Sequence, residues 1–138
     1  MTAYALDTNA CIALINGRTP LVREQFANAR AAGDTMAISS IVLFELRYGT
    51  AKSQRPEATA ARLNTFLEGP LEIIEFDDED AADAGAIRAT LERTGTPIGA
   101  YDVLIAGQAH RRGLTVVTAN VREFSRIPGL AWEDWAAV

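Results

Sequence analysis

The chain has 138 residues, which predicts one domain, and 49% of them are hydrophobic, enough to build a buried core. Its net charge of −5 argues against a protein that coats nucleic acid without specificity, because such proteins are basic. The charge does not exclude a local group of basic residues around an acidic site. No apolar run approaches the ~20 residues of a membrane span and no signal-peptide pattern opens the chain, so we expect a soluble, cytoplasmic protein without a membrane partner.

The sequence contains one cysteine, Cys11, and one histidine, His110. A single cysteine cannot form an internal disulfide and fits a reducing compartment. One Cys and one His also cannot assemble a zinc site of the usual nitrogen and sulfur kind within the chain. The number of residues allows one nucleophilic Cys–His pair. Each residue lies in a helical apolar pattern, however, so packing in or beside the core is the favoured interpretation.

Five short apolar runs predict strands, over residues 3–6, 36–38, 71–76, 114–118 and 130–132. Helical periodicity with start and stop residues predicts helices over residues 10–15, 20–33, 41–51, 56–69, 78–94 and 100–112, and residues 119–124 are expected to form a turn. Because strands alternate with helices, we expect an α/β fold in one domain over residues 1–138. Its sheet should be mostly parallel, with roughly five strands and helices on both faces.

The first strand ends at Asp7, which Thr8 and Asn9 follow. An acid, a hydroxyl and an amide after a short apolar run are typical of a buried strand that delivers polar groups to its carboxyl edge. In open α/β sheets, ligands bind beyond these edges, where the strand order reverses. Asp7 is therefore the first candidate site residue.

Glu45 lies in the helix over residues 41–51, whose residues are apolar almost all round, which predicts a helix covered on several sides. A carboxylate in such a helix must be paired, protonated or bound to a metal, because an isolated buried charge is too costly. An ion pair with an arginine from elsewhere in the chain is the alternative that the sequence leaves open.

Two later segments carry further candidates. Asp102 lies in the first turn of the helix over residues 100–112, where an aspartate that complements the helix dipole is the simpler interpretation. Thr118, Asn120 and Glu123 follow at the end of the next strand, where turn chemistry and a solvated acid are the simpler interpretation.

In a doubly wound sheet these positions converge at one edge. Three or four carboxylates packed closely would repel and raise one another's pKa values unless a divalent cation neutralised them. Hard oxygen ligands select Mg²⁺ or Mn²⁺, and such a centre favours hydrolysis of phosphodiester bonds. The sequence therefore predicts a metal-dependent hydrolase.

Four segments, in this order along nearly the whole chain, also resemble a known family. They are Leu-Asp-Thr-Asn at 6–9, Ser-Ser-Ile-Val-Leu-Phe-Glu-Leu-Arg-Tyr-Gly at 39–49, Gly-Thr-Pro-Ile-Gly-Ala-Tyr-Asp-Val-Leu-Ile-Ala at 95–106 and Thr-Ala-Asn-Val-Arg-Glu-Phe at 118–124. Together they resemble the PIN domain and, more narrowly, the VapC-type toxins of type II toxin–antitoxin pairs.

This resemblance implies a three-layer α/β/α PIN domain and a Mg²⁺- or Mn²⁺-dependent endoribonuclease, often aimed at tRNA. It also implies a VapB-type antitoxin that holds the enzyme inactive, and a homodimer. Asp7 and Asp102 match the metal-binding aspartates of the family, and Glu45 matches the acid that completes the catalytic cluster. At the fourth acidic position many relatives have Asp where this chain has Asn120, and Glu123 is the nearest acid. The side chains expected to support the ligands are Thr8, Asn9, Ser40, Thr118 and Asn120.

Three other classes of protein share features with this chain. A phosphoacceptor receiver domain requires an acid beside Asp7 and a late lysine, whereas Lys52 is the only lysine. A phosphatase of the haloacid dehalogenase type requires Asp-x-Asp where this chain has Asp7-Thr8-Asn9. A catalytically inert PIN-like module that binds RNA or an antitoxin is the remaining alternative, and three intact acids argue against it because unused buried acids are destabilising.

Partner-contacting residues are harder to assign from the sequence. Candidates to hold RNA phosphates are Arg47, Arg111, Arg112 and Arg122, with solvated helix faces as the simpler interpretation. Candidates to contact the antitoxin are Tyr48, Phe66 and Leu67, with core packing as the simpler interpretation.

Overall fold

A computed structural model describes residues 1–137, and the strands of this part of the chain form a five-stranded sheet. The strands are β1 Ala3–Leu6, β2 Thr35–Ser39, β3 Glu72–Ile74, β4 Thr115–Val117 and β5 Trp132–Glu133. Their order is β3-β2-β1-β4-β5, and every neighbouring pair is parallel. The expected α/β class is confirmed, and the sheet is wholly rather than mostly parallel.

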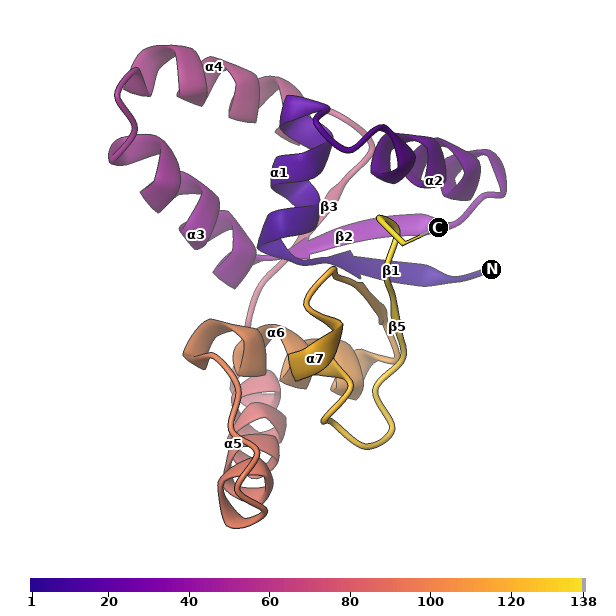
Figure 1. The fold of residues 1–138 in the computed structure, drawn as a ribbon, viewed down its shortest axis with the longest axis vertical. Helices are drawn as coiled ribbons and strands as arrows, with labels where there is room; N and C mark the ends of the chain where they lie inside the picture. The colour runs from indigo at the N-terminus through magenta and orange to yellow at the C-terminus, as the bar shows by residue number, and fades with distance from the viewer. Residues whose placement is uncertain (138) are drawn as a thin grey trace.

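Helices cover both faces of this sheet. They are α1 Thr8–Asn16, α2 Pro20–Ala31, α3 Ser40–Ala51, α4 Pro56–Leu67, α5 Asp78–Arg93, α6 Ala100–Arg112 and α7 Val121–Phe124. Figure 1 shows α1 to α4 on one side of the sheet and α5 to α7 on the other, which makes three layers. The first six match the expected helices to within a few residues, whereas α7 lies where the sequence predicted a turn.

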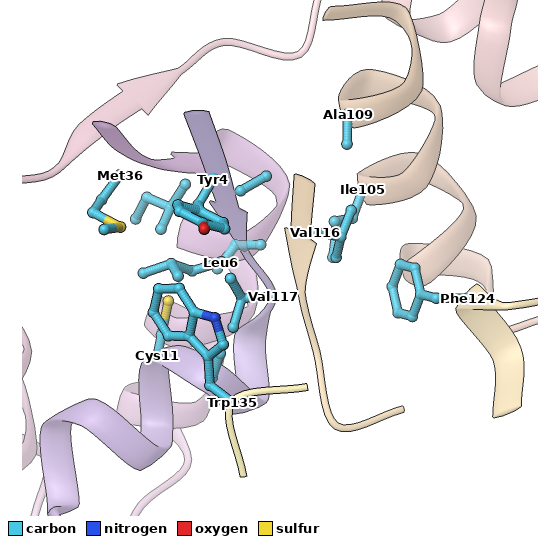
Figure 2. Packing of buried hydrophobic residues seen from close by; sticks show 14 of the residues in the cluster. Tyr4, Leu6, Cys11, Met36, Ile105, Ala109, Val116, Val117, Phe124 and Trp135 are labelled. Atoms are coloured by element: carbon cyan, nitrogen blue, oxygen red, sulfur yellow. The ribbon is translucent and has the colours of Figure 1, made fainter. Parts of the chain in front are cut away.

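The core lies on both faces of β1 and β4. Helices cover both faces of these strands, which explains why their sequences are apolar without alternation. Leu6, Ile38 and Val116, one each from β1, β2 and β4, are fully buried. Figure 2 shows part of this core, to which α6 contributes Ile105 and α7 contributes Phe124. Full burial of Phe124 stabilises the structure by roughly 2 kcal/mol, which explains how a helix of four residues is held in place.

The lone cysteine and histidine do not meet. Cys11 is fully buried in α1, as expected, and burial raises the pKa of its thiol, so it is an inert core residue. His110 is exposed near the end of α6, with Nδ1 3.4 Å from the Asp83 carboxylate, so it lies on the surface rather than in the core. The two helices cover opposite faces of the sheet (Figure 1).

A close backbone approach joins α5 and α6. A Cβ atom on Gly107 would lie 2.6 Å from the Cα of Ala84, which no rotation of a side chain can relieve. Glycine is therefore required at this position. The sequence pattern of small residues in this helix is explained by the contact, which brings the two helix axes close together.

A buried carboxylate also joins these helices. Asp80 of α5 is fully buried and accepts hydrogen bonds from Gln108 (3.0 Å), Arg111 Nε (2.7 Å) and Arg112 Nη2 (3.0 Å) of α6. The side-chain hydrogen bonds from the two arginines outweigh desolvation and hold the pKa of Asp80 well below its usual range. Arg111 and Arg112 are thus occupied on α5, so they are poor candidates for RNA phosphates.

The prediction that α3 is covered on several sides is wrong. Only Val42 and Leu46 are buried in this helix, whereas Phe44 and Tyr48 are exposed. An apolar composition implies burial only when neighbouring elements cover each face, and within residues 1–137 the neighbours of Phe44 and Tyr48 leave about half of each side chain exposed. Phe66 and Leu67 instead pack against the core, as their simpler interpretation predicted.

None of the helices formed by residues 1–137 is long and apolar enough to cross a membrane.

Candidate active site

Asp7 follows β1, the strand at which the order of the strands reverses. From β1 the chain proceeds to β2 and β3 on one side, then returns to β4 and β5 on the other, so the gap between β1 and β4 is the switch point. The Asp7 N–H donates to the carbonyl of Val117 (3.1 Å), and its carboxylate caps α1 by accepting from the Ala10 N–H (2.8 Å). This cap explains why α1 begins at Thr8, two residues before the predicted start. Only 4% of Asp7 is exposed, so its carboxylate is buried and fixed.

Thr118 supports Asp7 from the neighbouring strand. Leu6 and Val117 are paired in the register of β1 and β4, which places the next residues of both strands, Asp7 and Thr118, together. The Thr118 hydroxyl accepts from the Asn120 N–H (2.9 Å), which leaves its O–H free to donate to Asp7. Thr118 therefore lies beside Asp7, and its hydrogen bond lowers the pKa of Asp7, while its supporting role at a metal site stays a prediction.

Glu45 approaches from α3 and is held by α1. Ser39 caps α3 by accepting from the Ile41 N–H (3.1 Å), and Glu45 lies one turn beyond Ile41. The Thr8 hydroxyl donates to Oε1 of Glu45 at 2.6 Å. Asn9 is exposed in the same turn of α1 as Thr8. Glu45 is half-buried, and none of the ion pairs found in residues 1–137 includes it, so the expected alternative of an arginine partner is not what the structure has.

Asp102, Asn120 and Glu123 form one hydrogen-bonded group. Asn120 Nδ2 donates to Asp102 (3.2 Å) and to Oε2 of Glu123. The other oxygen of Glu123, Oε1, accepts from the Gly99 N–H at the start of α6. Asp102 does not cap α6, whose N-cap is Gly99. The amide of Asn120 therefore bridges two carboxylates, which an aspartate at this position could not do.

Negative charges accumulate around Asp102. Burial raises the pKa of Asp102 to about 6, and the charges of Glu123, Asp7 and Glu45 contribute to the rise. The charges that act on Asp102 thus come from three other segments, and Asp7 and Glu123, the two furthest apart, are separated by 116 residues in the chain.

The pKa values of Asp7 and Glu123 are shifted in opposite directions. Burial is also the main cause that raises the pKa of Asp7, with hydrogen bonds from Thr118 and the Ala10 N–H opposing it. Hydrogen bonds from Asn120 and Gly99 instead lower the pKa of Glu123. Glu123 is thus a stabilised carboxylate with both oxygens engaged, whereas burial disfavours the charged form of Asp7.

The donor set suits a hard divalent cation. None of Asp7, Glu45, Asp102 and Glu123 takes part in an ion pair within the described part of the chain. Over residues 1–137, no three His, Cys, Asp or Glu side chains lie close enough to hold an ion as they stand. Neighbouring carboxylates contribute, after burial, to the raised pKa values of Asp7 and Asp102, however, and that repulsion is the penalty that a bound divalent cation would remove. Carboxylate oxygens are the ligands that Mg²⁺ and Mn²⁺ prefer.

The structure adds one acid that the sequence did not single out. Asp134 directly follows β5, and its charge raises the pKa of Asp7. Its signal in the sequence was its place after a strand, the same signal that identified Asp7. Ser40, expected as a supporting residue, instead accepts from the Phe76 N–H (3.0 Å) and holds the end of β3.

Comparison with known families identifies the fold. Residues 4–130 match the family model described as PIN domain. The chain belongs to the PIN-domain family. Within it, this PIN domain is 48% identical over 135 residues to the tRNA(fMet)-specific endonuclease VapC of Salmonella typhimurium, which covers 98% of the chain and 99% of that protein. It is 43% identical over 132 residues to ribonuclease VapC2 of Rickettsia felis, over 96% of the chain and 97% of that protein.

Solved structures give the same assignment. The PIN domain superposes with a TM-score of 0.90 on a chain of VapBC2 from Rickettsia felis bound to a promoter DNA fragment, at 41% identity over 97% of this chain and 99% of that one. It superposes with a TM-score of 0.88 on a chain of DNA-bound VapBC from Salmonella typhimurium, at 47% identity over 98% and 99%. The resemblance to VapC-type PIN domains and the expected α/β/α architecture are therefore confirmed, and the chain is a member of a group of ribonucleases.

Proposed function

We propose that this PIN domain is the toxin of a type II toxin–antitoxin pair and that it is a Mg²⁺- or Mn²⁺-dependent endoribonuclease. The observation that carries the proposal is the gathering of Asp7, Glu45, Asp102 and Glu123 around one switch point without an arginine or lysine paired to them in residues 1–137. RNA as the substrate is supported by the relatives, two of which are named for tRNA(fMet).

Asp7 and Asp102 are the residues that would hold the cation, which when bound stabilises negative charge on the scissile phosphate and makes a nearby water easier to deprotonate. Thr118 and the Ala10 N–H fix the Asp7 carboxylate. Asn120 fixes Asp102 by its hydrogen bond.

Glu45 and Glu123 have different roles in this proposal. Glu45 has one oxygen held by Thr8, and no hydrogen bond within residues 1–137 engages the other, so it can orient the attacking water or accept its proton. Both oxygens of Glu123 are occupied by Gly99 and Asn120, so we assign it as a positioning residue rather than as the direct acid that the sequence predicted.

An antitoxin that inhibits the nuclease should reach the same acids. A groove of about 290 Å³ between α1, α3 and α4 includes Glu45 among its lining residues. Its walls combine apolar side chains with arginines, among them Ile12, Leu46, Leu63, Arg18 and Arg62. We propose that the cognate antitoxin inserts an apolar segment here, in keeping with the VapBC complexes of the structural relatives.

Cleavage assays on the antitoxin-free protein test the function. We expect tRNA(fMet) to be cut in the presence of Mn²⁺, cleavage to stop in EDTA, and Asp7→Asn to be inactive while remaining folded. Asp78→Asn is the matched control, because Asp78 is an exposed acid on α5. Adding the antitoxin should suppress cleavage. Equal cleavage by Asp7→Asn would refute the assignment of Asp7, and no cleavage of any RNA by the metal-loaded protein would favour the inert binding module.

A further inference from the structure

One face of the segment over residues 120–126 carries three polar side chains, those of Asn120, Glu123 and Arg126. The N–H of Glu123 donates to the carbonyl of Asn120 (3.2 Å), and the N–H of Arg126 donates to the carbonyl of Glu123 (3.1 Å). Hydrogen bonds between residues three apart bring the side chains of those residues onto the same side of the turn. We call Asn120, Glu123 and Arg126 the α7 clamp, because they belong to α7 and to the residues that flank it.

Each member of the α7 clamp bonds to the segment that leads into α6. The pairs are Asn120 with Asp102, Glu123 with Gly99, and Arg126 with Pro97. In the last pair, Nη1 of Arg126 donates to the Pro97 carbonyl at 2.7 Å. The partners follow one another backwards along the chain, so the two segments run in opposite directions and meet at three points. The α7 clamp therefore holds the chain on its way into the helix that carries Asp102.

The start of α6 has little support of its own. Its N-cap is Gly99, which offers no side chain to accept from the first N–H groups of the helix. Gly95 and Pro97, in the loop before it, are exposed. The Val103 N–H donates to the Gly99 carbonyl (3.0 Å) and closes the first turn, which contains Asp102. A shift of Gly99 would therefore be carried to the carboxylate of Asp102.

We propose that Arg126 is a positioning residue of the nuclease, which fixes the start of α6 through the Pro97 carbonyl and thereby orients Asp102. The inference rests on the proposed ribonuclease function and deepens it, because it adds a residue that acts on the site from outside. Arg126 bonds to the backbone and so needs no contact with the substrate or a cation. Loss of its hydrogen bond would free the loop before α6 and weaken the hold on Gly99. Asp102 would then depart from its productive orientation.

The alternative role for Arg126 is a direct contact with an RNA phosphate, because a guanidinium suits phosphate oxygens. The structure instead gives its Nη1 a carbonyl of the protein, at the short end of the range for an N–H···O hydrogen bond. The two roles differ in what they change. A phosphate contact adds to the affinity for RNA whether or not the RNA is cut, whereas a positioning residue changes the rate of cleavage and leaves the affinity nearly unchanged.

The experiment compares three variants with the parent protein. Arg126→Met nearly keeps the length of the side chain and removes its donors, whereas Arg126→Lys retains a donor and the charge. Arg93→Met is the matched control, because Arg93 is an exposed arginine at the end of α5. Its side chain bonds within that helix, to the hydroxyl of Thr90 (3.2 Å), and not to the loop that follows.

Three measurements are made on each variant. Amide hydrogen exchange, followed residue by residue by NMR, is compared at Gly99 and Val103, at the start of α6. The amide of Val116 in β4, which donates to the Ala131 carbonyl (2.9 Å), is the reference. The single-turnover rate of cleavage of tRNA(fMet) is measured in Mn²⁺. The affinity for the same tRNA is measured in an Asp7→Asn background, in which cleavage does not interfere.

We expect Arg126→Met to speed exchange at Gly99 and Val103 by about fivefold, which corresponds to the loss of one hydrogen bond, and to leave exchange at Val116 unchanged. Its cleavage rate should fall by about tenfold or more, while its affinity for tRNA stays within about twofold of the parent. Arg126→Lys should restore both the exchange and the cleavage rates to within about threefold of the parent, because it keeps a donor for Pro97. Arg93→Met should match the parent.

Three results would overturn the proposal. The first is an unchanged exchange rate at Gly99 and Val103, or an unchanged cleavage rate, in Arg126→Met. The second is a loss of cleavage matched by an equal loss of RNA affinity, which would make Arg126 a direct phosphate contact. The third is faster exchange at Val116 as well, or a variant that does not fold, which would give Arg126 a role in global stability alone. Failure of the nuclease function is detected separately, because a parent protein that cuts no RNA is recognised before any variant is tested.

Discussion

The hydroxyl of Thr8 donates a 2.6 Å hydrogen bond to the carboxylate of Glu45, 37 residues further along the chain. This bond joins the first turn of α1 to α3 beside the buried Asp7. It fixes one oxygen of Glu45 and so directs the other. The bond links α1, which follows β1, to α3, which follows β2. It therefore connects the two sequence motifs that contain Asp7 and Glu45.

Replacing Thr8 by Val removes this hydrogen bond and keeps the shape of the side chain. We expect the single-turnover rate of RNA cleavage to fall by about 10- to 100-fold, which is the usual effect of removing a residue that orients a functional carboxylate. The melting temperature should change little, and Thr8→Ser should restore the rate because it retains the hydroxyl. A Thr8→Val enzyme that cleaves at the wild-type rate would show that Glu45 needs no such orientation.

Replacing Asp102 by Asn should stabilise the metal-free protein while it abolishes cleavage. The pKa of Asp102 is raised from 3.8 to about 6, so its ionised form is disfavoured in the folded state at neutral pH. Stability linked to this group is present at low pH and is lost as the pH rises from about 4 to 6. After allowance for partial exposure, the variant should gain about 1 kcal/mol in urea unfolding at pH 7.5 in EDTA. The gain should shrink at pH 4.5, and a variant less stable than wild type at pH 7.5 would contradict the account.

Asn120→Asp exchanges a bridging amide donor for a third carboxylate between Asp102 and Glu123. The metal-free protein should lose about 1–2 kcal/mol, because a hydrogen bond to each charged group is replaced by repulsion. Mn²⁺ should then raise the melting temperature of the variant more than that of the wild type, since the cation has more repulsion to relieve. Asn28→Asp, on the exposed side of α2, serves as the control. An equal Mn²⁺ shift in the variant and the wild type would mean that position 120 lies outside the influence of the metal.

Asp80 should dominate the acid sensitivity of the α5–α6 pair. Its folded-state pKa lies well below its usual value, so the stability it contributes is present at neutral pH and is lost as the pH falls below about 4. We expect Asp80→Asn to cost about 2–3 kcal/mol at pH 7, less than a fully buried pair would because Arg111 and Arg112 are partly exposed. Urea unfolding at pH 7 and pH 3 measures it, with Asp78→Asn as the exposed control. A difference between Asp80→Asn and wild type that stays the same at both pH values would exclude this linkage.

The sequence was sufficient to locate elements and acids whose signals are local. Short apolar runs gave all five strands, and Asp7 and Asp102 were found because one ends a strand and the other begins a helix. The bridging role of Asn120 could not be predicted, because its partners Asp102 and Glu123 approach it only in the folded chain. The ion network of Arg111 and Arg112 was missed for the same reason.

Burial was the property that the sequence predicted least well. The apolar residues of α3 suggested a covered helix, yet Phe44 and Tyr48 are exposed. A hydrophobic pattern reports what a face can bury and says nothing of whether a neighbour is there to cover it. The four residues of α7 are too few to show helical periodicity, and their position is explained by the burial of Phe124 and the hydrogen bonds of Glu123.

The contact between Gly107 and Ala84 sets how closely α6 packs against α5. At 1.5 Å per residue, Gly107 lies about 7.5 Å along the helix axis from Asp102. A methyl group at position 107 would push α6 away from α5. Because a helix moves as a rigid unit, the carboxylate of Asp102 would be displaced with it. The geometry of the candidate active site therefore depends in part on the hydrogen atom that serves as the side chain of Gly107, a residue without a functional group.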